Sequence, residues 1–202
     1  HHPLLPSSFF SCDWRMMKNR VPQTILFGFI ILMIFITACA KNDSETKNNN
    51  TSQEESVKFV VVGGSGTILT SSDSNTWISE NSGTSNLLSD VIYENGTLIT
   101  IGGVFVDNVS TVLKSSNGKT WTSITTGTTK ILYDVAYGIN KYISTGSYGE
   151  VITSSDGSSW TLRSSGTTNQ LHGVEYGNSV FVSVGDGGTI ISSLDGITWT
   201  SR

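Results

Sequence analysis

The sequence predicts an all-β fold made of four repeats of about forty residues. A seven-residue phrase, SSDGSSW at 154–160, recurs as SSDSNTW, SSNGKTW and SLDGITW. The tryptophans that end the four copies lie 44, 39 and 39 residues apart. No stretch after residue 56 has helical periodicity. Repeats of this length with several short strands indicate a β-propeller, partial or four-bladed, in which each repeat is a four-stranded antiparallel sheet.

The N-terminal residues differ in composition from the repeats and indicate export. Residues 16–38 begin with a short basic segment and continue into the apolar run TILFGFIILMIFITA at 24–38. These 15 residues are too few for a membrane-spanning helix, which needs about 20, and are typical of the helix of a signal peptide. We interpret residues 1–15 as a non-native upstream extension, because translation from Met16 or Met17 gives a well-formed signal.

The apolar run ends in Ile-Thr-Ala-Cys at 36–39, which resembles the bacterial lipobox. In that family a peptidase cuts before the cysteine, which carries the lipid, so the resemblance implies that Cys39 anchors an exported chain to the membrane. Ala40 after the cysteine favours the outer membrane or the cell surface. The alternative is an uncleaved anchor with an incidental cysteine. Residues 39–56 form the linker, and we expect a disordered tether because 41–56 lack any large apolar side chain.

Each repeat is predicted to contain four short strands separated by glycine-rich turns. The second repeat carries extra residues at 104–110, which we expect to form a surface loop. The first repeat begins with its second strand at Val57, so we expect it to lack a first strand and to leave the ring open unless further chain completes it. In the last repeat the strands are predicted at 171–176, 180–184, 189–193 and from about 198. The repeats span 57–80, 81–124, 125–163 and 164–202.

The repeated phrase has the chemistry of a tight turn between the third and fourth strands. Its aspartate, or Asn117 in the second copy, offers an oxygen that accepts bonds from backbone N–H groups. The glycine that follows tolerates a positive φ, and where Ser74 replaces it in the first copy we expect Asn75 to adopt that conformation. The tryptophan supplies a large apolar contact for the neighbouring sheet. The turn residues are Asp73, Trp77, Asn117, Gly118, Trp121, Asp156, Gly157, Trp160, Asp195, Gly196 and Trp199.

These turns resemble the Asp-box, or bacterial neuraminidase repeat, which occurs in the propellers of sialidases, other glycosidases, sortilin-like receptors and photosystem II assembly factors. The resemblance covers the four copies and, more loosely, residues 57–202. It departs in spacing, since Trp160 follows Asp156 by four positions rather than the usual five. In the family these turns lie away from the active or binding face, so the resemblance implies that the repeated residues are structural.

Catalytic and metal-binding residue types are scarce in the repeats. Sialidases hold a carboxylated sugar with three arginines, and the repeats contain two, Arg163 and Arg202. His172 is the single histidine after the signal and no cysteine follows Cys39, so we predict no catalytic residue, metal site or cofactor. The acidic balance of residues 57–202 disfavours nucleic acid. A glycosidase with two carboxylates stays an alternative, using acids expected on ligand-facing loops: Asp90, Asp134, Glu150 and Asp186.

The predicted binding face consists of the loops between second and third strands together with the connections between repeats. Matched positions differ between repeats, as at Asn86, Lys130 and Asn169. Such variation is typical of a binding surface and also of unconstrained loops. We predict a non-catalytic domain that binds a protein or a glycan; the alternatives are a propeller glycosidase and a photosystem II assembly factor, which the lack of clustered arginines disfavours. The predicted binding residues are Asn86, Lys130, Tyr133, Tyr148, Glu150, Asn169, Gln170, His172 and Asp186.

Overall fold

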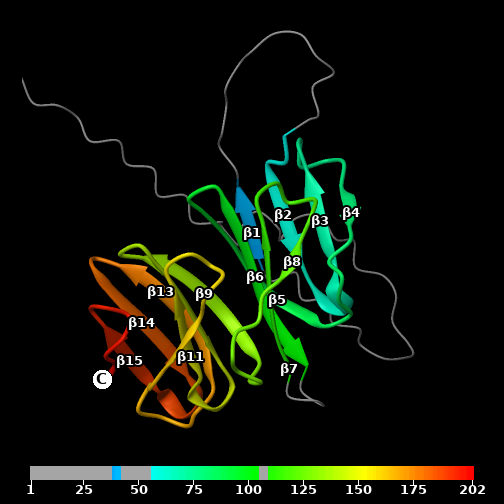
Figure 1. The fold of residues 1–202 in the computed structure, drawn as a ribbon. Coiled ribbons are helices and arrows are strands. Elements are labelled where there is room, and N and C mark those ends of the chain that lie inside the picture. The colour runs from blue at the N-terminus through cyan, green and yellow to red at the C-terminus, as the bar shows by residue number, and fades with distance from the viewer. Residues whose placement is uncertain (1–37, 42–55, 105–108) are drawn as a thin grey trace, which may run out of the picture. The chain divides into compact units, whose positions relative to one another are not determined.

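A computed structural model describes residues 38–41, 56–104 and 109–202. The predicted extension 1–15, the signal up to residue 37 and most of the tether lie outside the described residues. Within these ranges the chain forms four antiparallel sheets of four strands each (Figure 1), and the strands of every sheet follow one another in chain order. Within the second, third and fourth sheets this up-and-down order follows from the short connections, which can join only neighbouring antiparallel strands.

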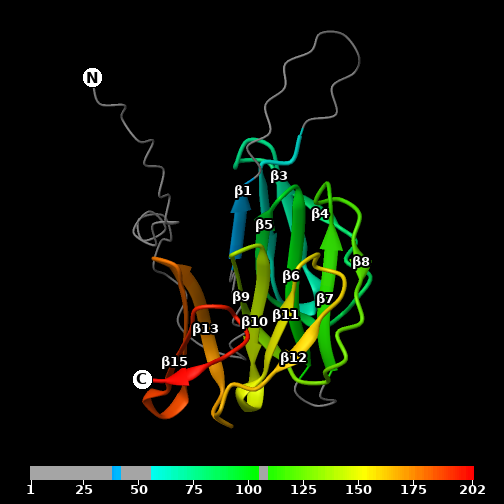
Figure 2. The same ribbon diagram turned by 60° about the vertical axis from the view of Figure 1, so that its left-hand side comes forward.

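The four sheets succeed one another along the chain, and Figure 2 shows the strands of the third sheet side by side. The first sheet contains β1 (Ala38–Lys41), β2 (Phe59–Val62), β3 (Ile68–Ser71) and β4 (Ile78–Glu80). The second contains β5 (Leu87–Glu94), β6 (Thr97–Val104), β7 (Val109–Ser115) and β8 (Thr122–Ser123). The third contains β9 (Leu132–Gly138), β10 (Lys141–Gly146), β11 (Val151–Ser154) and β12 (Thr161–Arg163). The fourth contains β13 (Leu171–Gly177), β14 (Val180–Gly185), β15 (Ile190–Ser193) and β16 (Thr200–Ser201).

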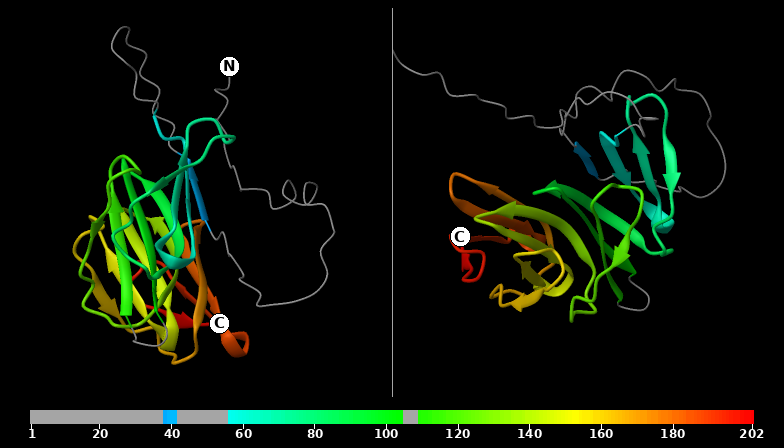
Figure 3. Two further views of the ribbon diagram at one scale, coloured as in Figure 1. Left: turned by 90° about the vertical axis from the view of Figure 1, so that its right-hand side faces the viewer. Right: turned by 45° about the horizontal axis from the view of Figure 1, so that its top comes forward.

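The first sheet differs from the expectation that it lacks a first strand. β1 pairs antiparallel with β2, from Ala38 opposite Val62 to Lys41 opposite Phe59. In Figure 3 this blue strand lies beside the cyan strands of the same sheet. These residues were predicted to be the end of the signal and the start of the linker, because they directly follow the apolar run at 24–38. Cys39 therefore lies within β1, and its lipidation stays a prediction.

The insertion predicted at 104–110 lies between β6 and β7. These strands pair up to Val104 opposite Val109. Residues 104, 109 and 110 therefore belong to the hairpin, and the surface loop expected between them, residues 105–108, lies outside the described ranges.

The hydrophobic core consists of three clusters, one at each junction between successive sheets. We call the face of a sheet that packs on the following sheet its front, and the opposite face its back. At the first junction Val60, Val62 and Ile68 of the first sheet's front meet Leu88 and Leu113 of the second sheet's back. Residues at the matching positions of the later sheets form the clusters at the other two junctions. Each strand is apolar on both faces because each inner sheet is covered on both sides.

The repeated turns form one hydrogen-bonded pattern. In the third sheet Asp156 Oδ1 accepts the backbone N–H groups of Ser158 and Ser159, each at 2.8 Å. Ser154 Oγ accepts the N–H of Gly157 at 2.8 Å and donates to Asp156 Oδ1 at 3.0 Å. The bonds from Ser159 and Ser158 stabilise the carboxylate and lower the pKa of Asp156 to about 2. The matching carboxylates Asp73 and Asp195, and the amide of Asn117, accept the same pair of N–H groups.

The turn glycine is required for two reasons. Gly157 has φ +68°, and a Cβ there would lie 2.6 Å from Ile99 Cδ1 on the front of the second sheet. Gly196 has the same relation to Ile143. In the first sheet it is Ser74, with φ +65°, that adopts the left-handed conformation, so the expectation for Asn75 was wrong.

Candidate functional site

Two sets of loops lie together at one end of the sheets, and we call this end the loop face. The turns between second and third strands are η2 (Gly64–Gly66), η3 (Ser147–Gly149) and η4 (Asp186–Gly188). Each is bonded to the segment that leads into a first strand: Ser147 N donates to Ile131 O and Asp186 N to Gln170 O, both at 2.9 Å. The backbone of this face therefore has a similar arrangement in the first, third and fourth repeats, while in the second repeat the β6–β7 hairpin takes the place of the short turn.

The connections between sheets are also built alike. A hydroxyl at Ser82, Thr126 or Ser165 bonds to the backbone two residues on. A threonine hydroxyl then accepts the N–H of the residue that leads into the first strand: Asn86, Lys130 or Asn169. The backbone of the three connections is thus alike, while the side chain at this position is Asn in two of them and Lys in the third.

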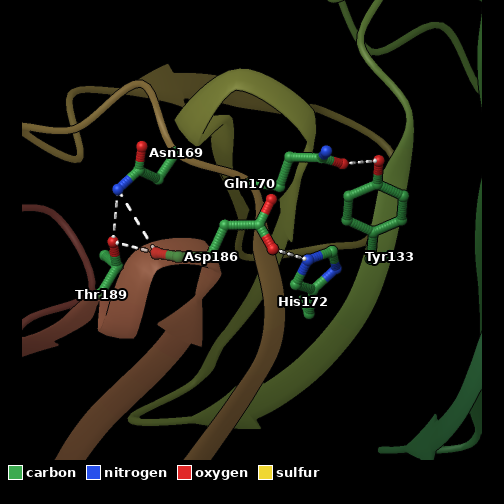
Figure 4. Close-up of polar contacts among 6 residues, drawn as sticks. All are labelled: Tyr133, Asn169, Gln170, His172, Asp186 and Thr189. Atoms are coloured by element: carbon green, nitrogen blue, oxygen red, sulfur yellow. Dashed lines mark hydrogen bonds and ion pairs between the residues drawn. The ribbon is translucent and has the colours of Figure 1, made fainter.

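A groove of about 350 Å³ lies on the loop face where the third sheet meets the fourth. It is bordered by the start of β9, by η3, by the connection into β13 and by η4. The residues that line it are Ile131, Tyr133, Ser147, Tyr148, Thr168, Asn169, Gln170 and Asp186. Figure 4 shows four of its polar side chains, Tyr133, Asn169, Gln170 and Asp186, close to His172 and Thr189, although these residues come from three separate stretches of the chain.

Two neighbouring aromatic rings lie at the groove, one at the start of β9 and one at the start of β13. Tyr133 and His172 occupy matched positions, and both lie at a shift in strand register, where a residue is left out of the pairing. Such a bulge turns a side chain away from its regular direction. The rings lie 5.3 Å apart between centroids, and Tyr133 Oη donates to Gln170 Oε1 at 2.5 Å. Burial, followed by the charge of Asp186, raises the pKa of Tyr133, which therefore stays a neutral donor.

His172 carries the second polar contact of the groove. Its Nε2 lies 2.7 Å from Asp186 Oδ1 (Figure 4), and the two side chains are 51% and 52% exposed. Asp186 also holds the η4 turn, since its carbonyl accepts the hydroxyl of Thr189 at 2.7 Å. A pair exposed to this extent contributes little to stability and leaves its remaining hydrogen-bonding capacity accessible to a ligand.

Tyr148 is the most unusual residue of the groove. Its φ is +57°, and its side chain is 66% exposed. Small residues, Ser65 and Gly187, adopt this conformation in η2 and η4. An aromatic residue here costs on the order of 1–3 kcal/mol in backbone strain. Lys130 Nζ lies 4.6 Å from the centroid of the Tyr148 ring, which places a cation at the rim of the groove.

Two predicted binding residues lie apart from this groove. Asn86 belongs to the second sheet, where its Nδ2 donates to Thr111 Oγ1 at 2.8 Å. Glu150 lines a wide, open hollow beside Arg163. Asn169 lines the groove but repeats the Asn86 contact, since it donates to Thr189 Oγ1 at 2.7 Å. The structure therefore gathers Lys130, Tyr133, Tyr148, Asn169, Gln170, His172 and Asp186 around one groove.

Asp90 and Asp134 lie in β5 and β9, not on loops as the sequence analysis expected. Asp90 Oδ2 accepts the N–H of Val135 at 3.1 Å, and Asp134 Oδ2 accepts that of Val174 at 2.7 Å. Each carboxylate thus links one first strand to the next. Desolvation, together with contact with Asp134, raises the pKa of Asp90 well above its usual value. Both carboxyl groups therefore accept backbone N–H groups within the sheets and have a structural role there.

No group of three or more histidine, cysteine, aspartate or glutamate side chains in the described ranges is arranged to hold a metal ion. Among the described helical segments none is long and apolar enough to cross a membrane.

No protein-family model and no curated protein sequence matches the chain. Solved structures do. YCF48 from Cyanidioschyzon merolae matches with a TM-score of 0.58 and 17% identity, over 83% of this chain and 56% of that one. YCF48 bound to D1 peptide matches with a TM-score of 0.50 and 17% identity, over 70% of this chain and 48% of that one. The chain thus spans about half the length of the structures it matches.

The fold is that of a β-propeller. The predicted all-β class and the four-stranded antiparallel sheets are confirmed. Identity at this level establishes architecture alone, so function has to be argued from the groove. In this propeller the first strands β5, β9 and β13 neighbour one another in succession, and the loop face lies at one end of them.

Proposed function

We propose that this propeller is a non-catalytic binding domain that holds a segment of another polypeptide in the groove between its third and fourth sheets. The observation that carries the proposal is Tyr148, a strained and exposed aromatic residue beside a preformed groove. Strain of this kind persists where the surrounding structure enforces it and is concentrated at binding sites. Tyrosine is also enriched among the residues that dominate protein interfaces.

The chemistry of the groove supports binding rather than catalysis. It contains one carboxylate, Asp186, which is bonded to His172. The raised pKa of Tyr133 opposes formation of the phenolate that a tyrosine nucleophile would need. The remaining polar groups are hydroxyls and amides, with Lys130 at the rim, and they suit the carbonyl, N–H and carboxylate groups of a peptide. One neighbour in fold, YCF48, has a structure with D1 peptide, which favours a polypeptide over a glycan as the ligand class.

Site-directed photocrosslinking tests this function. A photoreactive phenylalanine analogue is placed at Tyr148 or at Gln170, and in the control at Ile197, which is exposed in the turn of the fourth sheet. We expect positions 148 and 170 to capture the same polypeptide and position 197 to capture none. Capture from position 197 alone, or capture of a glycan that competes at position 148, would contradict the proposal.

A narrower function, assembly of photosystem II, can be tested on the same groove. In the described residues Arg163 and Arg202 lie on different sheets, and each donates its Nε to a strand hydroxyl, at Thr153 and Ser192. They form no basic patch. We therefore expect D1 peptide, titrated into the protein, to bind no more tightly to the natural chain than to a Tyr148→Ala variant.

We also propose that the chain is exported and lipid-anchored through Cys39, on the basis of its lipobox-like sequence. Labelled fatty acid should be incorporated into the natural chain and not into a Cys39→Ser variant. Equal labelling of both chains would refute the anchor.

A further inference from the structure

The outer strand of the third sheet differs from the other outer strands at one exposed position. Leu162 in β12 pairs with Ile152 of β11, and its side chain is 60% exposed. The matching residues of the other outer strands are also exposed, but each is a serine: Ser79, Ser123 and Ser201. The third sheet packs on both the second and the fourth. The exposure of Leu162 is therefore not that of an uncovered end sheet.

The backbone of Leu162 is also directed towards the free edge of its sheet. In an antiparallel pair, residues whose N–H and C=O groups bond to the partner strand alternate with residues whose groups point away from it. Ile124 and Arg202, which match Arg163, donate their N–H groups to the adjacent strand at 2.9 and 2.8 Å. The groups of Leu162, one residue before Arg163, therefore point away from β11. Because β12 is the outer strand of the described sheet, a further strand can pair with it here.

This edge is continuous with the groove on the loop face. The hollow beside Arg163 has a volume of about 790 Å³, and both Leu162 and Thr168 line it. Thr168 lines the groove as well. The η3 turn lies between the two, with Tyr148 on the groove side and Gly149 on the side of the hollow. A polypeptide that lies in the groove can therefore continue past Tyr148 to β12.

Two charged residues beside Tyr148 stand where the second and fourth repeats have a hydrogen-bonded asparagine and threonine. In the fourth repeat Asn169 Nδ2 donates to Thr189 Oγ1 at 2.7 Å. The matching residues of the third repeat are Lys130 and Glu150. Lys130 lies over the ring of Tyr148 at the rim of the groove, and Glu150 lines the hollow. The third repeat thus departs from the repeated structure along the path that joins the groove to β12.

We infer that the polypeptide held in the groove continues as an extended strand along β12 and packs an apolar side chain on Leu162. The inference rests on the proposed function and adds the class of segment that binds. Backbone hydrogen bonds to an exposed sheet edge supply affinity, and contacts with alternate side chains supply specificity. Residues opposite one another in paired strands lie on the same face of the sheet, so Leu162 selects an apolar residue at the position opposite to it.

Photocrosslinking from position 162 tests the path. The photoreactive phenylalanine analogue is placed at Leu162 and, in the matched control, at Ser123, which occupies the same place on β8. The crosslinked peptides are identified by mass spectrometry. We expect positions 162 and 170 to capture one polypeptide at two sites within a single segment, and position 123 to capture none. Capture from position 170 but not from 162 would overturn the inference and leave the proposed function standing, whereas capture from neither would refute both.

Two substitutions separate the side-chain contact from the backbone pairing. Leu162→Ser gives β12 the residue of the other outer strands, and Leu162→Pro removes the outward N–H that an added strand needs. We expect each to lower the yield captured from position 170 by about tenfold. Ser123→Pro makes the same change in β8 and should leave that yield unchanged, and unfolding in urea checks that each variant is folded. An unchanged yield in Leu162→Pro would overturn the strand pairing, and an unchanged yield in Leu162→Ser would overturn the apolar contact.

Discussion

The repeated turns between third and fourth strands, which we call the turn face, and the loop face are built from the same four repeats but by opposite rules. On the turn face the same hydrogen bonds recur: a serine hydroxyl accepts the N–H of the left-handed residue, which is glycine in three repeats and Ser74 in the first, and an aspartate or asparagine oxygen accepts two further N–H groups. On the loop face the backbone recurs and the side chains do not, as Ser65, Tyr148 and Gly187 show. Repetition therefore marks the residues that set backbone conformation, and divergence marks those free to contact a ligand.

Within the loop face, too, some residues repeat a structural bond and others do not. Asn86 and Asn169 make the same bond to a threonine, so they belong to the scaffold although they lie among the variable residues. Lys130 stands at their position in the third sheet and instead contacts the ring of Tyr148. The position at which asparagine and its bond to threonine are replaced is therefore the one beside the ring of Tyr148, at the rim of the groove.

The largest effect is expected on the turn face, from Gly157→Ala. The substitution forces a Cβ into a left-handed conformation and against Ile99, so we expect the free energy of unfolding in urea to fall by about 2–4 kcal/mol. The control is Gly166→Ala, which has φ +76° and nothing within 4 Å of the added Cβ. It should cost about 1 kcal/mol, from strain alone. Equal losses in the two variants would show that the turn does not pack on the preceding sheet.

The second effect concerns the carboxylates that link the first strands. Asp134→Ala leaves the N–H of Val174 without its acceptor, and we expect a loss of about 1–3 kcal/mol in the free energy of unfolding. Gly173→Ala changes the matched position of the fourth sheet, where a Cβ would lie 3.4 Å from its nearest neighbour. That control should remain within about 0.5 kcal/mol of the natural protein. If Asp134→Ala were equally neutral, the link between first strands would be unimportant for stability.

The two kinds of aspartate should respond to pH in opposite directions. The pKa of Asp156 is lowered to about 2, so its stabilisation is present above the unfolded pKa of about 4 and is lost as pH falls through 2. The pKa of Asp90 is raised, so its stabilisation is present below about 4 and is lost as pH rises through the folded value. Unfolding in urea from pH 2 to 8 should show that Asp156→Asn weakens the acid-side loss and Asp90→Asn weakens the loss at higher pH. Unchanged slopes in both variants would refute these assignments.

The smallest effect on stability is expected from Tyr148→Gly on the loop face. Glycine adopts the left-handed conformation without strain, as Gly187 does in η4, and few contacts are lost because the ring is exposed. We expect the free energy of unfolding to stay the same or rise by about 1 kcal/mol or less. A loss comparable to that of Gly157→Ala would mean that Tyr148 is structural.

Much of the scaffold could be predicted because its determinants are local. The turn phrase lies within seven residues, and the last repeat's strands begin and end within two residues of the predicted positions. The features that could not be predicted depend on pairing between strands. Nothing in the sequence of 38–41 distinguishes a strand from the end of an apolar signal, and the shift in register that turns Tyr133 towards the loop face depends on pairing with β10.

The groove itself was only partly predictable. Variation at matched positions of the repeats predicts most of its side chains. It does not predict their contacts, which join residues that are far apart in sequence, such as Tyr133 with Gln170 and His172 with Asp186. The prediction also included Asn86. Its matched positions hold Asn in two repeats and Lys in the third, so in the sequence a residue with a repeated structural bond could not be told from a variable binding residue. Nothing in the sequence indicates the positive φ of Tyr148 except the small residues at its matched positions, Ser65 and Gly187.

The most direct test of the division between the two faces compares photocrosslinking from position 170 in the natural chain and in the Tyr148→Gly variant, measured beside their unfolding curves. We predict a variant that is as stable as the natural protein and no longer captures the polypeptide from position 170. A stable variant that retains full capture would contradict the claim that the groove between the third and fourth sheets is the binding site.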